Sequence, residues 1–106
     1  MAKYLITASY TLDGTRGLIK EGGSSRRAAV EQMLQSLGGK LESFYYAFGQ
    51  TDVFAIVDVP DAGSAVAVSL TINAAGGVQV RTTPLLAPAE IDAACKKSIR
   101  YRAPGA

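Results

Sequence analysis

The chain has 106 residues, of which 48% are apolar, and a formal net charge of +2 from 11 basic and 9 acidic side chains. This length predicts one domain that buries a core without disulfides or bound metals. A single cysteine excludes an internal disulfide, and the apolar runs are far shorter than the roughly 20 residues of a membrane-spanning helix, so we expect a cytoplasmic protein with no membrane partner.

The opening segment, residues 3–10, alternates in the manner of a β-strand with two distinct faces. The residues on one of these faces are Tyr4, Ile6, Ala8 and Tyr10. Asp13 and Gly14 end the strand, and a short helical turn is predicted from there to Ile19.

The first long helix is predicted to begin at Ser24 or Ser25, since either offers an N-cap after the glycine pair 22–23. Its apolar residues follow the i, i+3, i+4, i+7 spacing of one helix face. They are Val30, Met33, Leu34 and Leu37. The glycine pair 38–39 supplies a left-handed stop.

Residues 40–48 and 52–59 predict a β-hairpin joined by a tight turn from Gly49 to Asp52. The second of these strands is apolar on both faces, because Phe54 and Ile56 alternate with three further apolar residues. A sheet that is covered by helices on one face and by a second subunit on the other explains this pattern.

The second half of the chain predicts another helix and another strand. Asp61 offers an N-cap, and the glycine pair 76–77 ends the helix. A small-residue stripe is predicted to face the core, made of Ala62, Ala65, Val66, Ser69 and Leu70. Residues 78–86 predict a fourth strand, and Pro88 fits the first turn of a short terminal helix that runs to about Lys97.

Positive charge is concentrated at the end of this last helix and in the residues that follow it. The final eleven residues contain four basic side chains, Lys96, Lys97, Arg100 and Arg102. Residues 1–95 contain the other seven basic residues and all nine acidic ones, so they carry a net charge of −2. We expect a folded domain over residues 1–95 and a basic tail over residues 96–106. Four charges at a chain end are typical of a solvated tail, and no basic stripe with interleaved aromatics predicts nucleic-acid binding.

The order of these elements predicts an α+β fold, a ferredoxin-like βαββαβ sandwich. Right-handed crossovers place two helices on one face of a four-stranded antiparallel sheet, with the short C-terminal helix added. The other face of the sheet must then be hidden or functional.

Several segments together resemble the GYD-domain family, a group within the dimeric α/β-barrel proteins of ferredoxin-like fold, over about residues 3–90. The segments that carry the resemblance are Lys3–Ile6, Leu37–Leu41, Phe44–Tyr45, Gly49–Asp52, Val53–Val57, Pro60–Asp61 and Val80–Thr83. The family usually has tyrosine before the turn aspartate, where this chain has Thr51. The resemblance implies a homo-oligomer, a dimer or larger, that assembles through its sheet.

The sequence carries no catalytic or metal-binding cluster. Histidine is absent, which removes the commonest general base and the commonest metal ligand. Cys95 has neither a CxxC partner nor a histidine to activate it, so an inert thiol is expected. No glycine-rich phosphate loop is present. We expect neither a metal nor a cofactor.

A ligand pocket is the remaining possibility, on the helix-covered face of the sheet. Tyr10, Tyr45 (or Tyr46), Asp52 and Arg81 are the candidate ligand-binding residues. Alternation places Tyr45 and Tyr46 on opposite faces, and hairpin geometry favours a structural Asp52. Arg81 in a central position requires a carboxylate, Asp52 or Asp58, or a bound anion. Arg26, near the start of the first long helix, is well placed for an acidic ligand because of the free N–H groups there, but we expect it to be solvated at the surface.

Three hypotheses about function remain open. The first is an oligomeric domain that associates through its sheet and binds a small anionic or aromatic molecule. The second is a cofactor-free monooxygenase or isomerase for a small activated aromatic substrate, using Tyr10, Tyr45, Asp52 and Arg81. The third is a structural subunit of a larger assembly. The sequence leaves open whether the protein is an enzyme.

Overall fold

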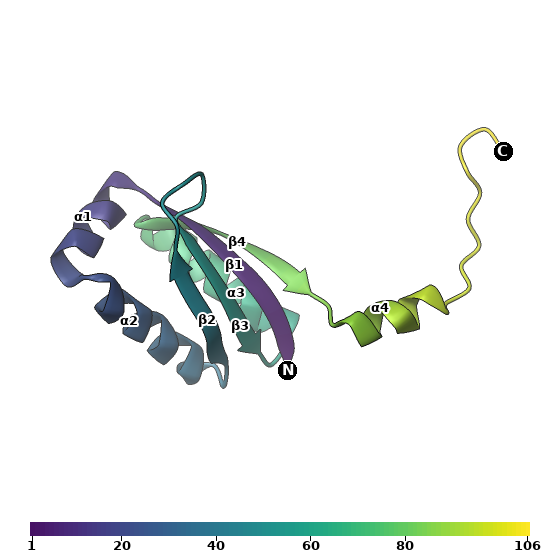
Figure 1. The fold of residues 1–106 in the computed structure, drawn as a ribbon, viewed down its shortest axis with the longest axis horizontal. Coiled ribbons are helices and arrows are strands. Elements are labelled where there is room, and N and C mark those ends of the chain that lie inside the picture. Colours follow the sequence, from purple (N-terminus) through teal and green to yellow (C-terminus); the bar gives the residue numbers. More distant parts are fainter.

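Four strands and four helices follow one another along residues 1–106 in the computed structural model (Figure 1). They are β1 (Ala2–Tyr10), α1 (Leu12–Glu21), α2 (Gly23–Ser36), β2 (Lys40–Tyr46), β3 (Val53–Val59), α3 (Ala62–Ala75), β4 (Val78–Leu85) and α4 (Pro88–Cys95). The sheet has the strand order β2-β3-β1-β4, and every neighbouring pair is antiparallel. The predicted ferredoxin-like fold is confirmed.

The two faces of the sheet differ in burial. Alternate residues of β3, from Val53 to Val59, are buried beneath the helices, together with Tyr4, Ile6 and Ala8 of β1. The opposite face, called the open face below, carries the other residues of each strand. One transverse row of this face runs from Tyr45 through Phe54 and Thr7 to Arg81.

The most buried part of the core lies on α2 and β3. Leu34 and Val59 are its most buried large side chains, at 1% and 0% exposure. Val30, Met33 and Leu37 pack around them, so the predicted apolar face of α2 is confirmed. Removing these aliphatic groups from water is the main stabilising contribution of such a core.

The predicted stripe on α3 is wrong in part. Ala65 is buried, but the other core residue is Val68, whereas Val66 and Leu70 are 55% and 66% exposed. The helix is apolar nearly all round, so its sequence pattern does not define which face turns inward. Packing against β3 and β4 decides the orientation instead.

A shared glycine joins α1 to α2. Gly22 has φ 86°, ends α1 by donating its N–H to the Leu18 carbonyl at 2.7 Å, and is also the N-cap position of α2. The predicted cap at Ser24 or Ser25 is therefore wrong: α1 extends to Glu21, and both serines lie inside the first turn of α2.

The start of α1 is fixed against the turn that precedes β4. Thr11 caps the helix through its side chain and donates its hydroxyl to the Gly76 and Gly77 carbonyls at 2.9 and 3.0 Å. A Cβ atom on Gly14 would overlap the Gly77 carbonyl oxygen. Glycine is therefore required at position 14 by close backbone contact.

The hairpin connection is longer than the predicted four-residue turn. β2 ends at Tyr46 and β3 begins at Val53, and the Ala47 N–H donates to the Asp52 carbonyl at 2.8 Å to close the loop. Phe48 adopts φ 53° in this loop, a conformation unusual for a bulky residue. The Asp52 N–H bonds the Ala8 carbonyl at 2.8 Å, which ties the loop to β1.

The chain leaves the body of the domain after β4. Leu86 and all later residues are exposed, and α4 projects away from the sheet in Figure 1. The predicted end of α3 at the glycine pair 76–77 is confirmed, with Gly76 left-handed at φ 81°, whereas α4 ends at Cys95, short of Lys97. No helix has both the length and the apolar character needed to cross a membrane.

Candidate ligand cavity beneath the sheet

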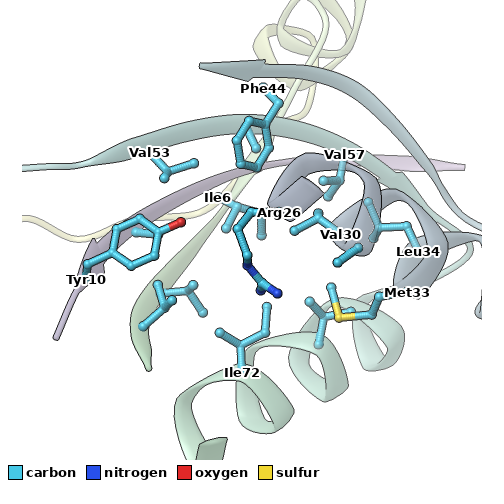
Figure 2. A pocket seen from close by; sticks show the side chains of 16 residues that line it. Ile6, Tyr10, Arg26, Val30, Met33, Leu34, Phe44, Val53, Val57 and Ile72 are labelled. Carbon is cyan, nitrogen blue, oxygen red and sulfur yellow. The ribbon is translucent and has the colours of Figure 1, made fainter. Parts of the chain in front are cut away.

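An apolar cavity of about 130 Å³ lies between the helix-covered face of the sheet and the helices α2 and α3. It exists because α2 packs mainly on β2 and α3 mainly on β4, at opposite sides of the sheet. The two central strands present small side chains below this gap, among them Ala8 and Ala55, which do not fill it. The walls are made by Ile6, Phe44, Val57, Val30, Met33 and Ile72 (Figure 2).

Arg26 is the one charged residue in the cavity lining. It lies in the first turns of α2, and Figure 2 shows its side chain reaching across the cavity toward Ile72. Its Nη1 approaches Oε2 of Glu21 at 3.4 Å, and its side chain is 36% exposed. The guanidinium is therefore reachable from the cavity and from solvent.

Two tyrosines lie at this end of the cavity. The Tyr10 hydroxyl points into it (Figure 2). The Tyr46 hydroxyl donates to the Gly23 carbonyl at 3.0 Å, and a Cβ atom on Gly23 would come within 3.1 Å of the Tyr46 ring. Burial, followed by the neighbouring Tyr10 phenol, raises the pKa of Tyr46 to about 12, while Arg26 acts in the opposite direction. The Tyr46 phenol is therefore neutral at ordinary pH.

The four candidate residues named from the sequence do not converge. Tyr10 lines the cavity, but Tyr45 and Arg81 lie on the open face, where Tyr45 is 72% exposed. The alternation that separates Tyr45 from Tyr46 holds, and Tyr46 is the one beside the cavity. Asp52 accepts the backbone N–H of Tyr10 at 2.8 Å, which is the structural role that hairpin geometry favours.

The expectation that Arg81 needs a carboxylate partner is wrong. β4 is an edge strand and Arg81 is exposed, so water solvates the guanidinium. Asp58 bonds Lys3 at 3.0 Å instead. Arg81 lines a polar hollow of about 480 Å³ on the open face with Thr7, Ser9, Gln50, Thr51 and Gln79.

Sequence reasoning considered Arg26 for an acidic ligand but favoured the solvated surface, and so missed its place in the cavity. A signal was present, because Arg26 precedes Val30 by four residues and Met33 by seven. These spacings put all three side chains on one helix face. A basic residue one turn before an apolar helix face, on the same side of the helix, is expected to lie at the edge of the core that this face covers.

The lining can bind and orient an anion but offers little for proton transfer. It contains no carboxylate, and the chain has no histidine. No three acidic, cysteine or histidine side chains come together as a metal site. Cys95 is exposed on α4, outside the cavity.

The fold and the cavity define a small α+β ferredoxin-like domain with an apolar cavity between sheet and helices. The sequence profile of the GYD domain matches residues 4–95, and the chain belongs to the GYD-domain family. No curated protein and no solved structure matches the chain.

Proposed function

We propose that the protein is a ligand-binding domain that forms a homo-oligomer, a dimer or larger, through the open face of its sheet. The observation that carries the ligand-binding part is the apolar cavity with a cation and a phenol at one end. Pockets of this composition, mostly apolar with a few polar groups, are typical of small-molecule sites. A small anionic or aromatic molecule suits these walls.

Exposed apolar side chains support association through the open face. Phe54 is 42% exposed in the middle of the sheet, and its cross-strand neighbour Tyr45 is 72% exposed. Ile56 and Leu5 continue the apolar surface in the adjacent row. Aromatic residues of this kind are enriched in protein interfaces. We also propose a cytoplasmic location, because the single cysteine is a free, exposed thiol and the cytoplasm keeps such thiols reduced.

Binding is better supported than catalysis. The oxygenase hypothesis relied on Asp52 and Arg81 acting together in a pocket. Asp52 is engaged by the backbone of Tyr10, and Arg81 lies on the other face of the sheet. Without a carboxylate in the cavity lining, a bound substrate has no side-chain base in contact with it.

Native mass spectrometry of the protein purified from its own host tests both parts of the proposal. We expect an oligomer that retains a molecule of small mass. An Ala29→Leu variant, in which the added side chain narrows the cavity, should form the same oligomer without the extra mass. Bare oligomers that also fail to bind small-molecule probes would favour the structural-subunit hypothesis instead.

A matched pair of surface variants tests which face associates. Phe54→Lys places a charge in the open face, whereas Leu70→Lys places the same charge on the exposed side of α3. We expect light scattering to give a monomer for Phe54→Lys and the native oligomer for Leu70→Lys. A monomeric wild type, or dissociation by Leu70→Lys alone, would contradict association through the sheet.

A further inference from the structure

The size of the cavity restricts what can occupy it. Its volume is about 130 Å³. A protein cavity of roughly 150 Å³ lined by Leu, Ile and Phe stays dry and takes up benzene. The cavity beneath this sheet therefore fits one six-membered ring or an apolar chain of about six carbons.

Arg26 has donors to spare for an occupant. A guanidinium carries N–H donors in a planar fork that matches a carboxylate. Here its contact with a carboxylate is the 3.4 Å approach to Glu21, whose side chain is 47% exposed. That separation is beyond the usual range for a strong N–H···O bond. Most of the hydrogen-bonding capacity of Arg26 is thus available to an anion in the cavity.

Further polarity at the same end favours a negative head group. The Tyr10 hydroxyl points into the cavity (Figure 2), and both Tyr10 and Arg26 lie close enough to Tyr46 to affect its pKa. α2 begins without a side-chain cap, so the positive end of its dipole lies one turn from Arg26. Tyr46 donates to the Gly23 carbonyl, so of these two neighbouring phenols Tyr10 is the one whose hydroxyl can turn from Tyr46 to an occupant. The opposite end, at Leu34 and Val57, is wholly apolar.

We propose that the cavity binds a small monocarboxylic acid whose apolar body has about six carbons, as a ring or as a short chain. The carboxylate lies on the Arg26 guanidinium and the Tyr10 hydroxyl, and the body lies among Val30, Met33 and Ile72. A second negative charge would be unmatched, because no other cation lines the cavity. This inference rests on the proposed function, since it needs a cavity that takes up a ligand.

Calorimetric titration of the full chain at neutral pH with four probes tests it: hexanoate, benzoate, 1-hexanol and hexylamine. We expect the better of the two acids to bind about tenfold more tightly than hexanol, the effect of one charge-assisted bond. Hexylamine, positively charged at this pH, should bind most weakly. The ratio between hexanoate and benzoate distinguishes a chain-shaped body from a ring.

Substitutions at the cation separate charge recognition from cavity filling. Arg26→Gln should remove the preference for acids while hexanol still binds. Arg27→Gln is the matched control, because Arg27 is the next residue of α2, pairs with Glu31 at 3.2 Å and lies outside the cavity lining. Glu21→Gln, at the exposed end of α1, releases Arg26 from its carboxylate contact, so the affinity for acids should rise about threefold.

The outcomes distinguish this inference from the proposed function. Equal binding of acids and hexanol, unchanged by Arg26→Gln and Glu21→Gln, would overturn the carboxylate and leave ligand binding standing. Failure of every probe to bind the wild type would overturn both. An Arg27→Gln variant that loses acid binding as fully as Arg26→Gln would show that general surface charge, and not the cavity, attracts the acids.

Discussion

The carboxylate of Asp52 accepts the backbone N–H of Tyr10 at 2.8 Å and so joins the residue before β3 to the last residue of β1. A hydrogen bond to a charged acceptor in a half-buried position contributes about 1.5–3 kcal/mol. We expect Asp52→Ala to lower the free energy of unfolding by that amount in urea denaturation. Asp52→Asn keeps an acceptor oxygen and should lose less.

The same substitution checks the role of Asp52 in binding. Because its side chain faces Tyr10's backbone and not the cavity, Asp52→Asn should bind the small-acid probes about as well as wild type. A variant of native stability that binds no probe would assign Asp52 to the ligand site instead.

Replacing each of two glycines in α1 by alanine should change the stability of the protein in opposite directions. A Cβ on Gly14 overlaps the Gly77 carbonyl, whereas a Cβ on Gly17 meets nothing within 4 Å. Gly17→Ala should stabilise the protein by about 0.5–1 kcal/mol through helix propensity. Gly14→Ala should destabilise it by about 1–3 kcal/mol, as overpacked substitutions do. Thermal unfolding of the two variants makes the comparison, and equal effects would contradict the close contact.

Two leucines test the orientation of the helices. Leu34 on α2 is 1% exposed and Leu70 on α3 is 66% exposed. Leu34→Ala should reduce the free energy of unfolding by about 2–5 kcal/mol, the usual range for a buried leucine. Leu70→Ala should change it by less than about 0.5 kcal/mol in the monomer. A large effect at Leu70 would indicate that α3 turns its predicted stripe inward after all.

The raised pKa of Tyr46 predicts that the protein loses stability at alkaline pH. Its pKa is raised from 10.0 to about 12, chiefly by burial, so the unfolded chain releases this proton first as pH rises. The stability that the neutral phenol contributes is full below pH 10 and is lost between pH 10 and 12. Ultraviolet titration of phenolate should show one late tyrosine in the wild type.

Tyr46→Phe is the control for this titration. The variant should lack the late phenolate and lose less stability over the same alkaline interval. Lys3, whose pKa is raised by its hydrogen bond to Asp58, titrates in both proteins and therefore cancels in the comparison. A late tyrosine that persists in Tyr46→Phe would move the assignment to another phenol.

Local patterns were sufficient to predict most of the fold. The alternation in β1 and β3, the glycine stop at Gly76 and the cap at Asp61 are each decided by neighbours in sequence, and the Asp61 carboxylate accepts the Ser64 N–H at 2.8 Å as predicted. The errors arose where tertiary contacts decide. α3 is apolar on every side, so only its packing selects Val68 over Val66.

The candidate site was harder to predict, because a cavity depends on spacing between elements. The sequence does not indicate that α2 and α3 are separated by a gap, or that the small residues Ala8 and Ala55 lie beneath it. Strand alternation alone could have excluded Arg81 from the cavity, since Arg81 alternates along β4 with the apolar Val78 and Val80, which line it. Arg26 became the leading candidate only when its neighbours in space were known.

The isolation of α4 has a consequence for how the protein unfolds. This helix has eight residues and buries none of them, and its main local support is the Glu90 side chain, which accepts the Ala87 N–H at 3.0 Å. Helices shorter than about 12 residues are marginal in water without such packing. Hydrogen exchange should therefore find α4 amides unprotected while β1 amides exchange only through global opening. The helix α4 can therefore unfold and refold without changing the stability of the rest of the domain.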